Sequence, residues 1–235
     1  MLKSGVYFTA FFVFIGSYAF AQKSSLKPHI YCDTAKYELS QYQDSLEFYK
    51  KKYGRKRHLH TKDEILKLAF YVALSHYPEL YNTKICLQLK PIASTMQAQP
   101  EADFIFRKKR NRKYKILINN DKQINGMFYR DLSFNSLVGW IGHELAHILD
   151  YSQKDNKKLI RFISSYVFSK KDMKKTEREA DRVTIKHGLG AQLLDGINFF
   201  HRNKKISRQY KKKKKDFYLS PEEIIVDINK NCKSD

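Results

Sequence analysis

GWIGHELAHILDY, residues 139–151, is the stretch that decides the expected fold and chemistry of this chain. His143 and His147 are four residues apart, so on a helix their rings lie on one face, one turn from each other. That spacing allows two imidazoles to bind one Zn²⁺ at about 2.0–2.1 Å each. Glu144 can reach a water in an open coordination position and act as a general base. The H-E-x-x-H pattern therefore predicts a helix that carries a metal site.

A chance occurrence of the pattern is the alternative, since roughly one chain in a hundred of this composition would carry it by accident. The surroundings argue against chance, because unpaired polar side chains inside an apolar segment would be costly. A wide apolar surface is expected on the same helix from Leu137, Val138, Ile141, Leu145, Ile148 and Leu149. A candidate third ligand also lies downstream.

The segment TEREADRVTIKHG, residues 176–188, offers the third protein ligand that an open zinc site requires. Glu177 and Asp181 are four residues apart and share one helical face. Glu177 can complete a His₂Glu donor set, and Asp181 can accept a hydrogen bond from the other ring nitrogen of a ligand histidine. Glu179 is a competing ligand, although with Thr176 as N-cap it would take the capping-box position.

Other residues remain alternatives for the same site. Asp150, seven residues after His143, is a further candidate ligand or a polar residue at the helix end. His187 and His201 can stabilise the oxyanion of a tetrahedral intermediate, or they are ordinary surface or packing histidines. The metzincin extension needs a glycine at position 150 and a histidine at position 153, and Asp150 and Gln153 exclude that class.

The sequence H-E-L-A-H (143–147) followed by E-R-E-A-D-R (177–182) resembles the gluzincins. It is most similar to the family of the CAAX prenyl endopeptidases and their soluble, exported bacterial relatives. The resemblance covers roughly residues 85–190, and the paired motifs are fairly specific. The transmembrane helices that flank the site in membrane members are not expected here, so the substrate and access route of those members do not transfer.

The resemblance implies a minimal zincin-like domain with one Zn²⁺ per chain. His143, His147 and Glu177 match the zinc ligands of the family, Glu144 matches its general base, and Asp181 matches its supporting carboxylate. The implied activity is hydrolysis of peptide bonds in peptide or protein substrates. A non-proteolytic exported protein that keeps the zincin fold for binding or envelope assembly is the main alternative, and a basic envelope-binding protein with a chance motif is the third.

Residues 1–21 have the pattern of a secretory signal peptide. Lys3 precedes an apolar run, and Ala19-Phe20-Ala21 is a small-x-small cleavage site. Cleavage near Ala21 would leave residues 22–235 as a single domain, periplasmic or secreted, with a basic helical C-terminal region. An uncleaved N-terminal anchor is the alternative. No later apolar run approaches membrane length, so no transmembrane span is expected in the mature chain.

The remaining patterns predict an α+β fold, with a small mixed sheet packed on helices. Thr61 and Glu64 suggest a capping box, and Pro78 is expected to end the helix that they begin. An extended substrate is expected to pair with a sheet edge within residues 91–107. Helices are expected in 35–53, 61–80 and from the H-E-x-x-H segment onward, and strands in 84–90, 103–108 and 113–120.

Charge and cysteine content complete the sequence evidence. The formal net charge is +21, with basic clusters in 50–60, 107–115, 170–175 and 211–215. These clusters allow weak electrostatic association with anionic envelope surfaces, and an ordinary solvated, lysine-rich surface is the alternative. No specific nucleic-acid binding is expected, because aromatic residues are not interleaved at a stacking spacing. Cys32, Cys86 and Cys232 allow one disulfide and one free thiol, with the pairing left open.

Overall fold

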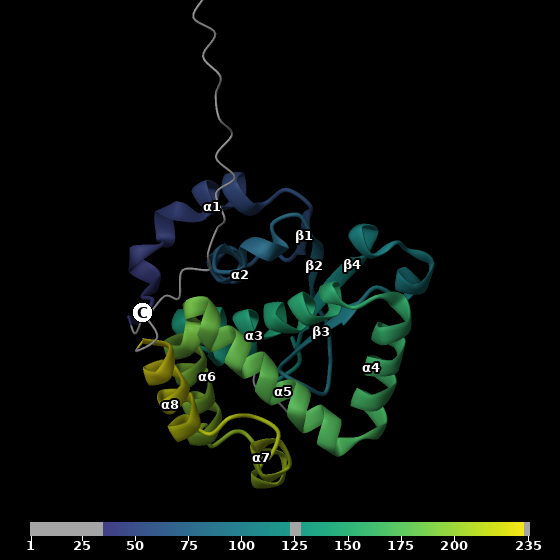
Figure 1. Ribbon diagram of the computed structural model, residues 1–235. Coiled ribbons are helices and arrows are strands. Elements are labelled where there is room, and N and C mark those ends of the chain that lie inside the picture. Colours follow the sequence, from purple (N-terminus) through teal and green to yellow (C-terminus); the bar gives the residue numbers. More distant parts are fainter. Residues whose placement is uncertain (1–34, 123–127, 233–235) are drawn as a thin grey trace, which may run out of the picture.

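A four-stranded sheet and eight α-helices make up the part of the chain that the computed structural model describes, residues 35–122 and 128–232 (Figure 1). The sheet is small and packs on the helices, as expected for the predicted α+β class. The signal peptide predicted at 1–21, and Cys32, lie outside the described residues. In the described part, Cys86 is a free cysteine and Cys232 is disulfide-bonded.

The sheet is mixed, with strand order β1-β2-β4-β3. Strands β1, β2 and β4 are parallel, and β3 pairs antiparallel with β4 at one edge, with Ala98 opposite Ile116. The strands are β1 Arg57–His60, β2 Lys84–Leu89, β3 Met96–Pro100 and β4 Lys113–Ile118. The predicted edge within 91–107 is therefore present as β3.

Two parts of the strand prediction were wrong. Residues 103–108 are not a strand, because Ala102–Phe106 forms the short 3-10 helix η4, whose Phe106 is 85% exposed. Strand β1 was not predicted, since its sequence RHLH lacks an apolar alternation. Arg57 takes the place of an apolar residue there: its guanidinium is buried and donates hydrogen bonds to the carbonyls of Leu80 and Thr83.

The predicted start of the second helix also needs correction. The N-cap of α2 is Asp63, whose carboxylate accepts a hydrogen bond from the Leu66 amide at 3.1 Å, while Thr61 Oγ accepts one from the Asp63 amide. The helix ends at Ser75, before Pro78. The helices are α1 Leu46–Tyr53, α2 Glu64–Ser75, α3 Phe134–Gln153, α4 Asn156–Phe168, α5 Lys170–Thr184, α6 Gly190–Arg202, α7 Arg208–Lys215 and α8 Pro221–Cys232.

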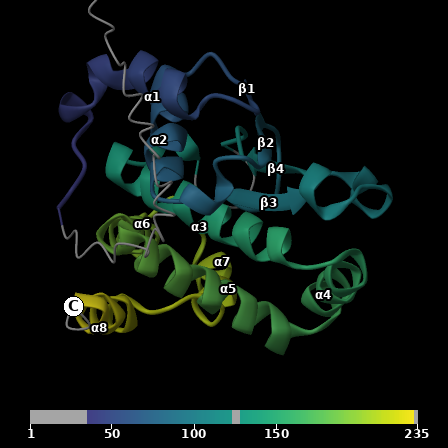
Figure 2. The same cartoon turned by 45° about the horizontal axis from the view of Figure 1, so that its top comes forward.

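Helix α3 runs through the middle of the molecule (Figures 1 and 2). Its N-cap is Ser133, which accepts a hydrogen bond from the Ser136 amide, and every residue from 134 to 149 is buried. The helix is covered by α2 and β3 on one side and by α5 and α6 on the other. Because no face of this stretch is left to solvent, its polar side chains must find partners inside the protein.

The contact between α3 and α6 is close enough to require glycine on both helices. A Cβ atom on Gly139 would lie 2.3 Å from the carbonyl carbon of Gln192, and one on Gly196 would lie 2.5 Å from Nε1 of Trp140. The two helix backbones therefore meet directly. This contact fixes the rotation of α3 about its axis and, with it, the direction in which His143 points.

None of the helices in residues 35–122 and 128–232 is long and apolar enough to cross a lipid bilayer.

The replacement Gly139→Ala tests the α3–α6 contact. The added methyl group meets backbone atoms that cannot rotate away, so we expect the free energy of unfolding to fall by about 1–3 kcal/mol, the usual cost of overpacking. Chemical denaturation followed by circular dichroism measures the change. Ser164→Thr adds one methyl group on the exposed side of α4 and is the control. Equal stability of the two variants would contradict the close contact.

Candidate metal centre

Three side chains predicted as ligands meet at one buried point between α3 and α5. Nε2 of His147 lies 3.1 Å from Nε2 of His143, and Oε2 of Glu177 lies 3.1 Å from the His143 nitrogen and 3.6 Å from the His147 nitrogen. The exposed fractions of the three residues are 1%, 5% and 6%. They form the only such group of potential metal ligands within the described residues.

The separations of these atoms suit a tetrahedral metal ion. Ligand atoms about 2.0–2.1 Å from a tetrahedral zinc are about 3.3 Å from one another, between the shortest and longest separations found here. The charge of the site also favours a cation, because Glu144, Glu177 and Asp181 are all buried with no lysine or arginine bonded to them in the described chain. Buried carboxylates need compensating positive charge. His143, His147 and Glu177 can therefore hold a metal ion.

Asp181 orients the first histidine, as the sequence indicated. Its Oδ1 lies 2.8 Å from Nδ1 of His143, and its Oδ2 accepts a hydrogen bond of 2.8 Å from the backbone amide of Leu219. Since a carboxylate accepts, Nδ1 carries a proton, and Nε2 is the ring nitrogen that can face a metal ion. Asp181 is completely buried, so these two bonds fix its position.

The electrostatics of the site draw positive charge toward the donor atoms. Burial alone would lower the pKa of His143, but Asp181 and Glu177 outweigh burial and raise that pKa well above its usual range. Burial alone would raise the pKa of Glu177, but His147 and His143 hold it well below its usual range. The carboxylates thus stabilise a cation at this point, whether a proton or a metal ion.

Glu144 lies outside the donor group and contacts the sheet edge. Its Oε2 accepts a hydrogen bond of 2.6 Å from the backbone amide of Ala98, in the middle of β3. Burial raises the pKa of Glu144, and the neighbouring charges of His143 and His147 act in the opposite direction. A carboxylate that holds protons more readily than usual, beside but not within the donor set, suits proton transfer.

Three tyrosines around the centre were missed by sequence reasoning. Tyr166 of α4 donates a hydrogen bond to Oε1 of Glu177, and the ring centroid of Tyr218 lies 5.7 Å from that of His143. Tyr151 stacks on His147 at 6.0 Å. Only Tyr151 had a usable signal, its i+4 spacing from His147; the other two reach the centre through tertiary packing.

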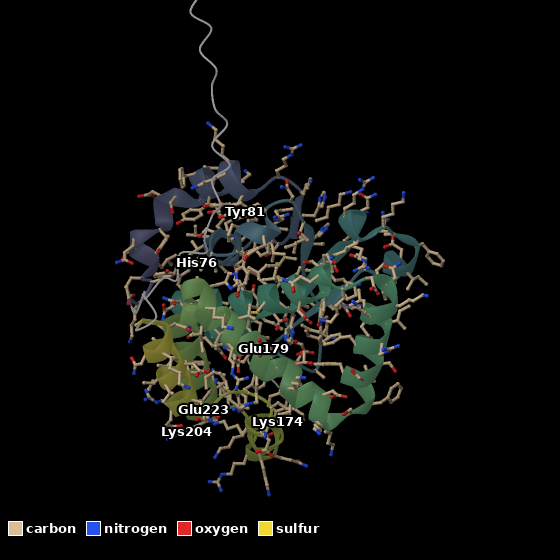
Figure 3. All side chains as sticks on the ribbon, in the orientation of Figure 1. His76, Tyr81, Lys174, Glu179, Lys204 and Glu223 are labelled. Atoms are coloured by element: carbon tan, nitrogen blue, oxygen red, sulfur yellow. The ribbon has the colours of Figure 1, made fainter. Side chains whose placement is uncertain are left out.

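The rival ligands do not reach the donor group. Glu179 is exposed on α5 (Figure 3) and pairs with Arg182, and Asp150 pairs with Lys154. The proposed capping role of Glu179 was also wrong, because α5 begins at Lys170 with Ser169 as its N-cap, about two turns before Thr176.

The two histidines considered for oxyanion stabilisation also lie elsewhere. The ring of His187 stacks on Tyr77 at 4.2 Å between centroids, and its Nε2 is 3.3 Å from Glu79. His201 lies near the end of α6, packed against Phe200. Neither ring contacts the donor group, so the packing interpretation of both is the better one.

A pocket of about 420 Å³ between α3, α4 and α5 reaches His147. Its lining includes Phe162, Glu179 and Val183 but not Glu144, which faces β3. The pocket therefore approaches the candidate ligand His147 from the side of α3 that lies away from Glu144 and β3.

Comparison of the chain with protein-family models, with curated protein sequences and with solved structures found no match in any of the three. The interpretation of the centre therefore depends on its own geometry and chemistry.

Metal analysis of the untagged protein tests the centre. We expect one equivalent of zinc per chain, and a sharp loss in His143→Ala, His147→Ala and Glu177→Ala, because two remaining ligands rarely hold zinc firmly. Asp181→Asn should keep the metal with an affinity about 10–100-fold lower. His58→Ala, at an exposed position of β1, is the matched control. Full occupancy in Glu177→Ala would exclude Glu177 as the third ligand.

Proposed function

We propose that this chain is a zinc-dependent endopeptidase of the gluzincin type, with the domain organisation of the soluble, exported relatives of the CAAX prenyl endopeptidases. The observation that carries the proposal is the position of Glu144. It adjoins the His143–His147–Glu177 donor group without belonging to it, and it contacts a sheet edge. A base beside an open metal site and an unpaired strand edge is what hydrolysis of an extended peptide requires.

The donor set supports zinc as the metal. Two imidazole nitrogens and one carboxylate oxygen are the ligands of one common class of catalytic zinc site, which keeps the fourth position open. When bound, zinc supplies Lewis acidity that lowers the pKa of water and polarises a carbonyl group. Tyr166 and Asp181 hold Glu177 and His143 in place through their hydrogen bonds, so little rearrangement is needed on binding.

Proton transfer is assigned to Glu144. Its carboxylate takes a proton from the water that attacks the scissile carbonyl carbon and delivers that proton to the leaving nitrogen as the carbon–nitrogen bond breaks. Burial raises the pKa of this carboxyl, which favours the first half of the transfer, in which the carboxylate takes up the proton. His143 and His147 lie at the same point, which places the base beside the metal ligands.

Strand β3 is assigned the role of substrate platform. The Ala98 amide donates to Oε2 of Glu144 at 2.6 Å, and the Ala98 carbonyl accepts from the hydroxyl of Tyr151 at 3.5 Å. Both backbone groups of Ala98 therefore point away from β4. A peptide that adds to this edge replaces Glu144 as the partner of the Ala98 amide. The carboxylate is then released toward the substrate as the substrate arrives.

Export belongs to the same proposal. Cleavage of the predicted signal peptide near Ala21 would place residues 22–235 in the periplasm or outside the cell as one domain. The substrate would then be an exported or external peptide or protein.

The replacement Glu144→Gln tests the catalytic assignment. The amide is nearly isosteric with the carboxylate, and Glu144 is not a ligand, so we expect the fold and the zinc content to persist. Peptide hydrolysis should fall by about 10²–10⁴-fold, the usual contribution of general acid–base catalysis. Zinc content and cleavage of a labelled unfolded protein are measured on the same samples.

Glu179→Gln is the matched control, since Glu179 is exposed on α5 and outside the donor group. Cleavage by Glu144→Gln at the wild-type rate would refute the mechanism. A wild-type protein that binds zinc and cleaves no peptide would instead favour the non-proteolytic binding protein.

A further inference from the structure

We infer that one edge of the molecule, formed by α4 and the loop from 102 to 112, docks on an anionic phospholipid bilayer and inserts apolar side chains into it. This edge is defined by its exposed residues Ile105, Phe106, Ile160, Val167 and Phe168 and is called the α4 edge below. The inference does not depend on the proposed function, because none of these five side chains belongs to the metal centre.

The α4 edge collects apolar side chains that the fold leaves in solvent. Phe106 and Phe168 are each 85% exposed, more than any other large hydrophobic residue in the described chain. Val167, Ile160 and Ile105 are 59%, 50% and 43% exposed, so five of the ten exposed large hydrophobic residues lie here. Concentrations of this kind mark interaction surfaces.

Helix α4 has two apolar faces with different roles. Leu159 is completely buried, and Tyr166 bonds to Glu177, so the inner face belongs to the body of the protein. Ile160, Val167 and Phe168 recur at helical spacing on the outer face. A helix of this kind can lie in the plane of a membrane surface with its outer apolar face buried to a shallow depth.

The loop and the helix are held together as one surface. The side-chain amide of Asn156, at the start of α4, donates to the carbonyls of Ile105 at 2.9 Å and Arg107 at 3.4 Å. Arg112 donates to Asn156 and to the carbonyl of Lys154. Both views place α4 and this loop at the same edge of the molecule (Figures 1 and 2), and side chains project outward from α4 in Figure 3.

Charge identifies the partner as anionic. Residues 103–113 and 155–171 carry eleven lysines and arginines against two aspartates, which gives +9 of the total net charge of +21. All eleven except the buried Arg112 are at least partly exposed. Only Arg107 and Lys158 of these eleven form ion pairs with described residues. The same loop lines a pocket of about 680 Å³ with Lys108, Lys109 and Arg110, which suits phosphate groups.

The combination of exposed rings and unneutralised cations favours a bilayer over other partners. A second copy of the chain would bring two such positive edges together, which repel. A soluble polyanion would satisfy the cations but leave Phe106 and Phe168 in water. Anionic phospholipid satisfies both, because apolar insertion and attraction to anionic headgroups act together.

Vesicle binding by the full chain tests the inference. We expect binding to vesicles of phosphatidylglycerol and phosphatidylcholine and little binding to phosphatidylcholine alone. The double replacement Phe106→Ser, Phe168→Ser should weaken binding by about tenfold or more, from the loss of apolar burial. Phe48→Ser, at a ring that is 60% exposed on α1, should change little and is the matched control.

A fluorescence measurement separates insertion from surface attraction. The emission of Phe168→Trp should shift to the blue and be quenched by brominated lipid on anionic vesicles, whereas that of Phe48→Trp should not. Undiminished vesicle binding by the double serine variant, or an unshifted tryptophan at position 168, would overturn the inference. So would equal binding to polyglutamate by the wild type and the double variant with no binding to vesicles, which would identify a soluble acidic partner.

Discussion

The bond between His143 and Asp181 is the interaction on which the centre depends. It joins α3 to α5, and the second oxygen of Asp181 extends the link to the amide of Leu219, just before α8. Helix α5 in turn carries Glu177, so one carboxylate sets both the tautomer of a candidate ligand, His143, and the position of the helix that carries the third candidate ligand. A buried carboxylate with a hydrogen bond to each of its oxygens rigidifies its surroundings.

The same arrangement concentrates negative charge inside the protein. Three carboxylates within one buried region are unfavourable without cations. The fold therefore accepts a local cost in stability at a site whose side chains can hold a cation. Tyr166 reduces this cost, since its hydroxyl donates a hydrogen bond to Oε1 of Glu177.

Sequence reasoning identified the centre better than the sheet. His143, His147 and Glu177 meet in the structure, and Asp181 contacts His143, because helical spacing places these side chains on facing sides of two helices. The catalytic role of Glu144 stays a prediction. Strand β1 was missed because the buried Arg57 conceals its apolar pattern, and η4 was taken for a strand because its apolar run is in fact exposed. The contacts of Tyr166 and of the Ala98 amide could not be predicted from the sequence, since they join elements that are distant along the chain.

The close contact between α3 and α6 restricts the sequence at positions that metal binding alone would leave free. Ligand geometry selects the histidines and glutamates, but it is indifferent to the residue four positions before His143, where the approach of Gln192 demands glycine. A genome search can require Gly139 and Gly196 together with acidic residues at the positions of Glu177 and Asp181. Such a search would discard accidental H-E-x-x-H sequences. Divergent relatives could then be recognised by the glycines at their helix contact, even where the rest of the sequence differs.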